Sequence, residues 1–322
     1  MRRILTIDGG GVRGIIPATL LARLEATTGR PTRDSFDFVA GTSTGAVLAA
    51  GLAAGIPADR LASLYAERSD EVFRRTPVLS TLRRIVRGAM YDTSVLNSLI
   101  RDELGSEARD WRLNDSPIDL LITAKRLRDG MPWYFVRDNP ENSCRAGAVR
   151  LSDAATASAA APTYFAPWDI AGIGELIDGG IGVAGNPVYQ ACVEAFHYTN
   201  AYVPADTLVV SLGTGKLLQR PRPRWLWTWL GWLLSELLRS PAEQQTELLH
   251  RHWPEARFYR LDLELEREIG LDAVGGIGAL RAMGERLAAS VDWSAILDGR
   301  DERYRVTDAT TLPREYCRPG PG

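Results

Sequence analysis

The chain has 322 residues, of which 45% are hydrophobic and 24% are charged, as in an ordinary globular protein with a sizeable core. Its 38 basic and 40 acidic residues give a formal net charge of −2, so no global field recruits a nucleic acid polymer. Three dispersed cysteines without a Cys/His cluster argue against a disulfide framework or a zinc site, and no apolar run reaches the ~20 residues of a transmembrane helix.

Predicted strands and helices alternate along the chain. The strands are expected at residues 4–7, 36–41, 118–124, 132–138, 207–212 and 257–265, and the helices at 15–29, 46–55, 56–73, near 187–197 and near 272–290. Continuously apolar strands between helices predict a three-layer α/β/α fold with a mostly parallel central sheet. The first apolar run is too short for a secretory signal, so we expect a cytoplasmic protein.

We expect one domain over residues 1–303, with a Trp/Arg-rich insertion at about 220–239, and a loose tail over 304–322. The first strand is followed by GGGVRG (9–14), which fits the G-x-G-x-x-G pattern of a dinucleotide-binding turn. That fold needs an acidic residue at the end of the second strand, but Asp34 and Asp37 lie before it or at its start. The alternative is a loop whose N–H groups, around Gly9, Gly10 and Gly11, stabilise a developing oxyanion.

The second strand is followed by GTSTG (41–45), which is G-x-S-x-G between a strand and a helix. This is the context of a nucleophile elbow, where flanking glycines allow a strained turn that exposes the serine. On its own the pattern also fits a tight polar turn. At this junction it predicts Ser43 as a nucleophile, next to the positive end of the helix dipole.

A serine nucleophile needs a base, and the usual base is histidine. The three histidines, His197, His250 and His252, follow no acidic partner in the expected order. Asp178 in ELIDGGI is the stronger candidate. Asp-Gly alone is a common hairpin turn, but beside two glycine motifs it predicts a carboxylate that takes the proton directly from Ser43.

DGGGVRG (8–14), GTSTG (41–45) and DGG (178–180), in this order, resemble the patatin-like phospholipases, and so do ATASAAAPTYFAP (155–167) and VVSLGTG (209–215). The resemblance covers about residues 1–215 and, more loosely, the remainder. It implies hydrolysis of fatty-acyl esters of phospholipids through an acyl-serine intermediate, without a metal or cofactor. By the same resemblance, Ser43 and Asp178 form a catalytic dyad, and Gly9, Gly10 and Gly11 supply the oxyanion hole.

Arg13 matches the basic position of the family's glycine loop, where it either shapes the turn, meets a phosphate or rigidifies the loop through a salt bridge. Asp8 is expected to bond N–H groups of the loop. Two further functions stay open, namely a catalytically silent lipid-binding or signalling module and a nucleotide-binding protein that uses the glycine loop.

Two arginine-containing segments suggest partners. In RPRPRWLWTWLGWLLSELLR (220–239), Trp225, Trp229 and Trp232 share a helix face, which predicts an interfacial element or lid at a phospholipid bilayer; packing in the core or a dimer contact is the alternative. A basic group comprises Arg74, Arg75, Arg83, Arg84 and Arg87. It is either a solvated face or a pocket for an anionic ligand. Bacterial members of the resembled family include anti-phage effectors activated by cyclic oligonucleotides, so such an activator, peripheral association with the inner face of the membrane and homo-oligomerisation are further hypotheses.

Overall fold

The computed structural model describes residues 1–73, 88–138, 146–182, 184–199, 201–217, 225, 229, 244–267 and 269–307. Within them, the central sheet has eight strands in the order β10-β9-β1-β2-β4-β8-β7, with β5 paired to β4 as well. Their bounds are β1 (Arg2–Ile7), β2 (Phe38–Gly41), β4 (Asp119–Arg126), β5 (Pro132–Val136), β7 (Trp168–Ile170), β8 (Gly174–Asp178), β9 (Thr207–Leu212) and β10 (Arg257–Leu261). A small second sheet pairs β3 (Ala89–Tyr91) with β6 (Thr163–Phe165).

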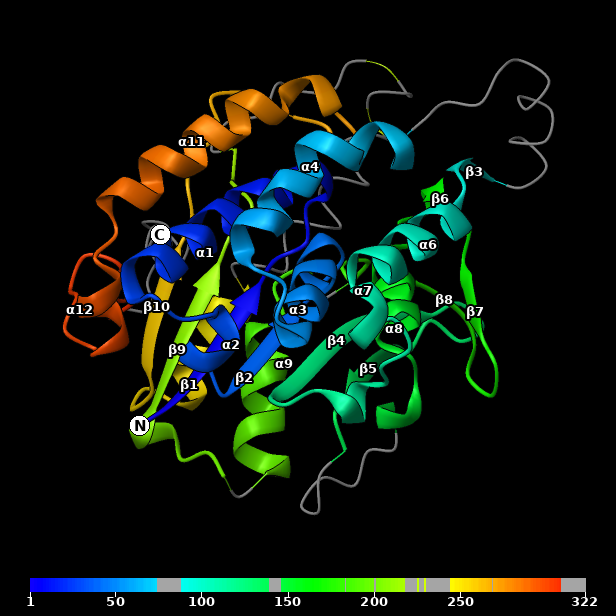
Figure 1. The fold of residues 1–322 in the computed structure, drawn as a ribbon. Coiled ribbons are helices and arrows are strands. Elements are labelled where there is room, and N and C mark those ends of the chain that lie inside the picture. The colour runs from blue at the N-terminus through cyan, green and yellow to red at the C-terminus, as the bar shows by residue number, and fades with distance from the viewer. Residues whose placement is uncertain are drawn as a thin grey trace, which may run out of the picture.

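Helices cover both faces of the central sheet (Figure 1). The named helices are α1 (Ile15–Thr28), α2 (Thr32–Ser35), α3 (Thr44–Ala54), α4 (Ala58–Val72), α6 (Thr93–Glu103), α7 (Gly105–Ala108), α8 (Leu151–Ala159), α9 (Val188–Val193), α11 (Ile277–Ser290) and α12 (Trp293–Leu297). α9 continues into a π-helical turn, Glu194–Tyr198, and residues 244–252 are also helical.

The core has two parts because successive residues of a strand face opposite sides of the sheet. In β1, Leu5 and Ile7 belong to the cluster under α1, α3, α4 and α11, whereas Ile4 belongs to the cluster that includes α9. β2 divides in the same way, with Val39 on the first side and Phe38 on the second. The three-layer α/β/α prediction is therefore confirmed.

The sheet is parallel from β10 to β4, whereas β5, β7 and β8 run antiparallel to their neighbours. This end of the sheet positions the site. β2 and β5 both pair with Leu121 and Ile122 of β4, so β2 and β5 lie on opposite sides of β4. β5 and β8 both pair with Ala124 and Lys125 of β4, so β8 also lies on the side opposite β5. β2 and β8 thus lie on the same side of β4 and point their carboxyl ends at each other.

Several boundaries differ from the prediction. The strand expected at 257–265 ends at Leu261, and the helix expected from residue 272 begins at Ile277. β8 and α8 were not among the expected elements, although both support the site. The division into a domain over 1–303 and a tail over 304–322 stays a prediction, because residues 308–322 lie outside the described part.

Candidate active site

Ser43 occupies the turn between β2 and α3 with φ 55° and ψ −122°, a strained conformation for a residue with a β-carbon. The flanking glycines allow it. A β-carbon on Gly41 would overlap the backbone of Gly45, and one on Gly45 would overlap the carbonyl oxygens of Ile7 and Asp8. The Ser43 N–H donates to Ser158 Oγ of α8 at 2.8 Å, which satisfies this buried backbone group.

Asp178 is the last residue of β8 and pairs with Ala124 of β4. Ala124 lies two residues beyond Ile122, the partner of Gly41 in β2. The shared side of β4 therefore brings Asp178 to Ser43 across 135 positions of sequence. Its carboxylate accepts a hydrogen bond from the Gly180 N–H at 2.7 Å, and it lies close enough to the Ser43 hydroxyl for that group to lower the pKa of Asp178. No histidine takes part in this pair, and the described contacts of His252, to Tyr189 and Trp253, lie elsewhere.

Burial raises the pKa of Asp178 from 3.8 to about 6, while the hydrogen bonds from Ser43 and Gly180 oppose the shift. Asp178 as a residue is only 1% exposed, and Ser43 is 9% exposed. At neutral pH the carboxylate is ionised, yet it is a far better proton acceptor than an aspartate in water. The arrangement is that of a base placed next to its nucleophile.

The glycine loop lies against this pair. A β-carbon on Gly9 would be 3.1 Å from Ser43 Cβ, which is tighter than ordinary packing. The Gly9 N–H donates to the Gly185 carbonyl at 3.0 Å and is thus already engaged. Among the described residues, the N–H groups of Gly10 and Gly11 have no protein acceptor, so these two are the donors that remain open to a ligand.

Two side chains orient those donors. Thr214 Oγ1 donates to the Gly9 carbonyl at 2.7 Å, and Arg13 Nε donates to the Gly10 carbonyl at 3.2 Å. In a trans peptide the carbonyl and the following N–H point in opposite directions. Fixing the Gly9 carbonyl therefore aims the Gly10 N–H, and fixing the Gly10 carbonyl aims the Gly11 N–H. Arg13 Nη1 also donates to the Gly215 carbonyl at 3.4 Å. These two contacts are of the kind expected if Arg13 shapes the turn.

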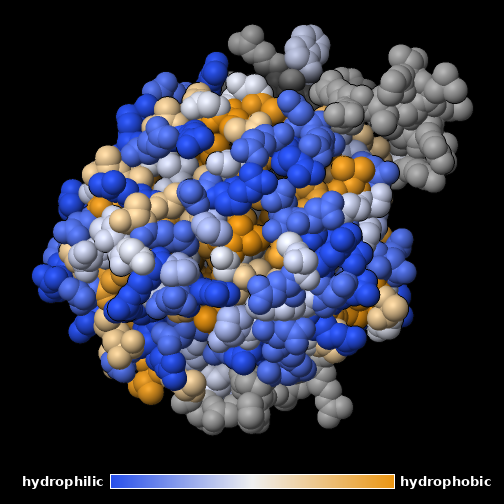
Figure 2. Space-filling view, viewed as in Figure 1, coloured by the Kyte–Doolittle hydropathy of each residue, from blue (hydrophilic) through white to orange (hydrophobic). Residues whose placement is uncertain are grey.

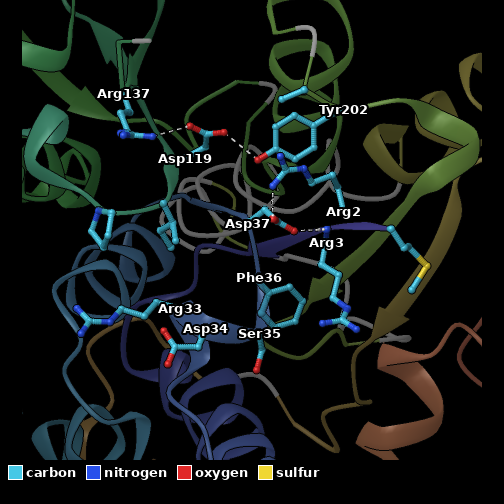
Figure 3. A pocket seen from close by; sticks show the side chains of 14 residues that line it. Arg2, Arg3, Arg33, Asp34, Ser35, Phe36, Asp37, Asp119, Arg137 and Tyr202 are labelled. Carbon is cyan, nitrogen blue, oxygen red and sulfur yellow. Dashed lines mark hydrogen bonds and ion pairs between the residues drawn. The ribbon is translucent and has the colours of Figure 1, made fainter.

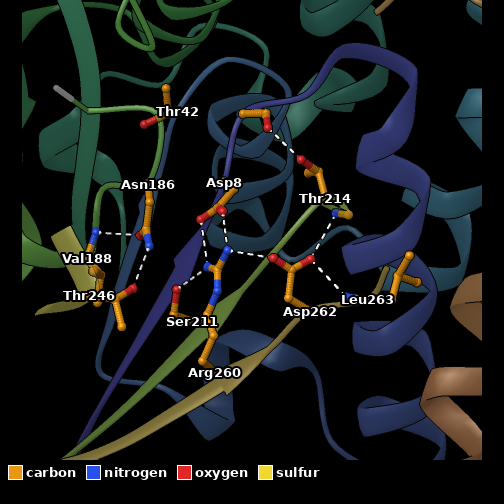
Figure 4. A network of polar contacts seen from close by, with 12 residues as sticks. Asp8, Thr42, Asn186, Val188, Ser211, Thr214, Thr246, Arg260, Asp262 and Leu263 are labelled. Atoms are coloured by element: carbon orange, nitrogen blue, oxygen red, sulfur yellow. Dashed lines mark hydrogen bonds and ion pairs between the residues drawn. The ribbon is translucent and has the colours of Figure 1, made fainter. Parts of the chain in front are cut away.

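Asp8 has a different role from the expected one. Its carboxylate accepts two hydrogen bonds from Arg260 of β10, at 3.0 and 2.6 Å, rather than bonding loop N–H groups (Figure 4). Arg260 also contacts Ser211 and Asp262, and Asp262 accepts from the Gly215 N–H. This buried network ties the end of β1 to β9 and β10, directly beneath the loop.

Sequence reasoning missed Ser158, Thr214 and Arg260, which position the reacting groups. Thr214 in LGTG and Ser158 in ATASAAAPTYFAP both lie in segments that contribute only to the family resemblance, and the segment around Ser158 shows no helical period. Arg260 gave no signal beyond a charged residue inside a strand.

The segments expected to meet partners are described only in part. Trp225 and Trp229 are exposed, at 74% and 43%, and the Trp229 N–H donates to the Trp225 carbonyl one helical turn away. Trp232, most of 220–239 and the arginines at 74, 75, 83, 84 and 87 lie outside the described residues. Their proposed roles stay predictions. In the described part of the chain, no helix is both long and apolar enough to cross a bilayer.

A pocket of about 480 Å³ lies at the opposite edge of the sheet, where β1, β2 and β4 begin (Figure 3). Its arginines are largely matched by carboxylates, since Arg2 pairs with Asp37 at 2.6 Å and Arg137 with Asp119 at 3.1 Å. Arg3 and Arg33 lie on opposite sides of Phe36. The pocket contains none of the residues of the Ser43 site.

Comparison with known proteins gives one family match and several relatives. The family model described as "Patatin-like phospholipase" matches residues 5–192, a range that includes the glycine loop, the elbow and Asp178. Two relatives are named "cGAMP-activated phospholipase": one from Vibrio cholerae is 34% identical over 66% of this chain, and one from Escherichia coli is 32% identical over 66%. The chain spans 64% and 62% of their lengths. VipD from Legionella pneumophila aligns with a TM-score of 0.47 and 12% identity, over 93% of this chain and 67% of VipD.

Proposed function

The chain belongs to the patatin-like phospholipase family, and from this we propose that it is a serine acyl hydrolase that cleaves fatty-acyl ester bonds of membrane phospholipids. The observation that carries the proposal is the approach of Ser43, in a strained elbow, to the buried carboxylate of Asp178, close enough for its hydroxyl to lower the pKa of that carboxyl. The glycine loop supports the proposal as well, since Gly9 lies against Ser43 and the N–H groups of Gly10 and Gly11 have no acceptor among the described residues.

The proposed reaction begins when Asp178 takes the hydroxyl proton and Ser43 Oγ attacks the ester carbonyl carbon. The negative charge passes to the carbonyl oxygen, which the Gly10 and Gly11 N–H groups stabilise. The intermediate then collapses to acyl-Ser43, and protonated Asp178 gives its proton to the departing lysophospholipid alkoxide. Water next attacks the acyl-enzyme as Asp178 accepts its proton, and the proton returns to Ser43 as the fatty acid leaves.

The test is fatty-acid release from phospholipid vesicles by the wild type and by the Ser43→Ala and Asp178→Asn variants. We expect release by the wild type and a loss of at least about a thousandfold in each variant, since nucleophile and base act as a unit. Equal release by Ser43→Ala would contradict the proposal. No release by any protein with any tested lipid would favour the catalytically silent lipid-binding module, whereas binding of NAD or ATP would revive the nucleotide-binding alternative.

We further propose that a cyclic dinucleotide activates the enzyme in defence against phage, at the cytoplasmic face of the membrane. Support comes from the printed names of the two bacterial relatives, "cGAMP-activated phospholipase". Addition of cyclic GMP–AMP should raise fatty-acid release by the wild type, with linear dinucleotides as the control. Full release without any nucleotide would overturn the regulatory proposal and leave the hydrolase intact.

A further inference from the structure

We propose that the turn between β4 and β5, residues 127–131, inserts into the headgroup region of a phospholipid bilayer and brings the active site to its substrate; this inference rests on the proposed lipid hydrolysis. The turn, here called the β4–β5 tip, has two large apolar side chains in solvent: Leu127 is 45% exposed and Met131 is 56% exposed. All five residues of the tip are exposed.

The tip lies on the side of the sheet from which lipid must arrive. β4 is parallel to β2 and ends at the edge where Ser43 follows β2. Ala124 is the partner of Asp178, and Leu127 follows three residues later, which at about 3.3 Å per residue lies ~10 Å further out. The Leu127 N–H donates to the Glu175 carbonyl at 2.9 Å, so the tip continues the pairing with β8. The tip therefore lies at the same edge of the sheet as the dyad, where a bilayer that delivers the substrate would contact it.

The tip is held in one shape, which lowers the cost of ordering it on binding. Arg126 N donates to the Met131 carbonyl at 2.9 Å, and Gly130, with φ 68°, allows the tight turn. The Asp129 carboxylate accepts from the Arg126 guanidinium at 2.6 Å and from the Met131 N–H at 3.2 Å. Arg126 also lies over the Trp133 ring, 5.4 Å from its centroid.

The charges around the tip suit a membrane surface, although weakly. Because Arg126 and Asp129 pair, Arg128 and Lys125 supply the remaining positive charge; neither forms a salt bridge with a described carboxylate. Glu175, opposite Leu127, reduces that charge. Apolar insertion should therefore supply most of the binding, with a smaller contribution from Arg128 to anionic lipid headgroups.

The tip is not alone in exposing large apolar side chains: Trp225 and Trp229 are 74% and 43% exposed, and both stay unchanged in every variant below. On the face shown in Figure 2, hydrophobic residues form separate small groups among hydrophilic ones. Val203 is 58% exposed but precedes β9, which starts at the opposite edge of the sheet. It is therefore a matched control, similar in exposure and remote from the dyad.

The experiment measures co-sedimentation with vesicles of phosphatidylcholine, with and without phosphatidylglycerol, in a Ser43→Ala background that prevents hydrolysis. We expect the double variant Leu127→Ser and Met131→Ser to lower the vesicle partition coefficient by about tenfold or more, and Val203→Ser to leave it unchanged. Arg128→Gln should weaken binding to the anionic vesicles alone, by less than about tenfold.

A second readout uses proteins with intact Ser43. The ratio of vesicle hydrolysis to hydrolysis of a soluble short-chain ester should fall in the tip variant and stay constant in Val203→Ser. If the tip variant bound vesicles as the wild type does, with or without a change in oligomeric state, the membrane role of the tip would be overturned. If the wild type hydrolysed no soluble ester, the proposed function would be refuted instead.

Discussion

At the scale of single residues, the proposed mechanism makes activity depend on the pKa of Asp178. Its rise to about 6 means that the carboxylate is protonated in acid and unable to accept the Ser43 proton. We therefore expect kcat/KM for a soluble ester to be level above pH 7 and to fall about tenfold for each pH unit below 6. A profile that stays level down to pH 5 would contradict the raised pKa.

The same burial has a cost in stability. A carboxyl whose folded pKa lies above its unfolded value favours folding when protonated, and this advantage is lost as pH rises through about 6. Removing the charge should thus stabilise the fold at pH 8, by up to ~3 kcal/mol for a shift of about two units. Asp178→Asn should melt at a higher temperature than the wild type at pH 8, and the gap should close towards pH 4. Equal gaps at both pH values would refute this assignment.

Thr214 tests the orientation of the oxyanion donors. Thr214→Val keeps the side-chain volume but removes the hydrogen bond to the Gly9 carbonyl, so the peptide that carries the Gly10 N–H loses its restraint. We expect kcat to fall about tenfold or more, with little change in KM and the same apparent pKa, because Asp178 is untouched. Thr214→Ser should restore the rate, and a variant that lowers KM and kcat together would point to a different role.

At the scale of elements, the elbow depends on the close approach of α3 to β1. Gly45→Ala would place a methyl group against the carbonyl oxygens of Ile7 and Asp8, and backbone there cannot give way cheaply. We expect a loss of about 3 kcal/mol or more in the free energy of unfolding. Gly278→Ala is the control, since this exposed position in α11 has open space; it should stabilise by about 0.5–1 kcal/mol in the same urea titration.

Elements with a clear period were predictable, and those that complete the site were not. α1 and α3 were found because apolar runs followed glycine turns, and the three family motifs identified Ser43 and Asp178 as candidates. α8 is buried on nearly all sides, so its small residues show no polar face from which a helix is recognised. β8 has five residues and its last one, Asp178, is followed by Gly179. An Asp-Gly pair equally fits a hairpin turn.

At the scale of the whole molecule, the two edges of the sheet have separate tasks. The carboxyl edge of the parallel strands holds the dyad and the β4–β5 tip, whereas the opposite edge holds salt bridges such as Arg2–Asp37, whose side chains are 50% and 31% exposed. Arg2→Ala should lower the free energy of unfolding by less than about 1 kcal/mol and leave kcat/KM for a soluble ester unaltered. A marked change in kcat/KM would show that the edges communicate.

The order of the chain also determines when the proposed active site becomes complete. Ser43 and Asp178 precede Thr214 and Arg260, which fix the glycine loop and the end of β1, and Leu271, whose carbonyl accepts from the Val12 N–H. A ribosome releases the chain from its N-terminus, so the nucleophile and base emerge before the residues that aim the oxyanion donors. An unfinished chain therefore lacks the contacts that fix the glycine loop, and the proposed active site is complete only after β9 and β10 have docked.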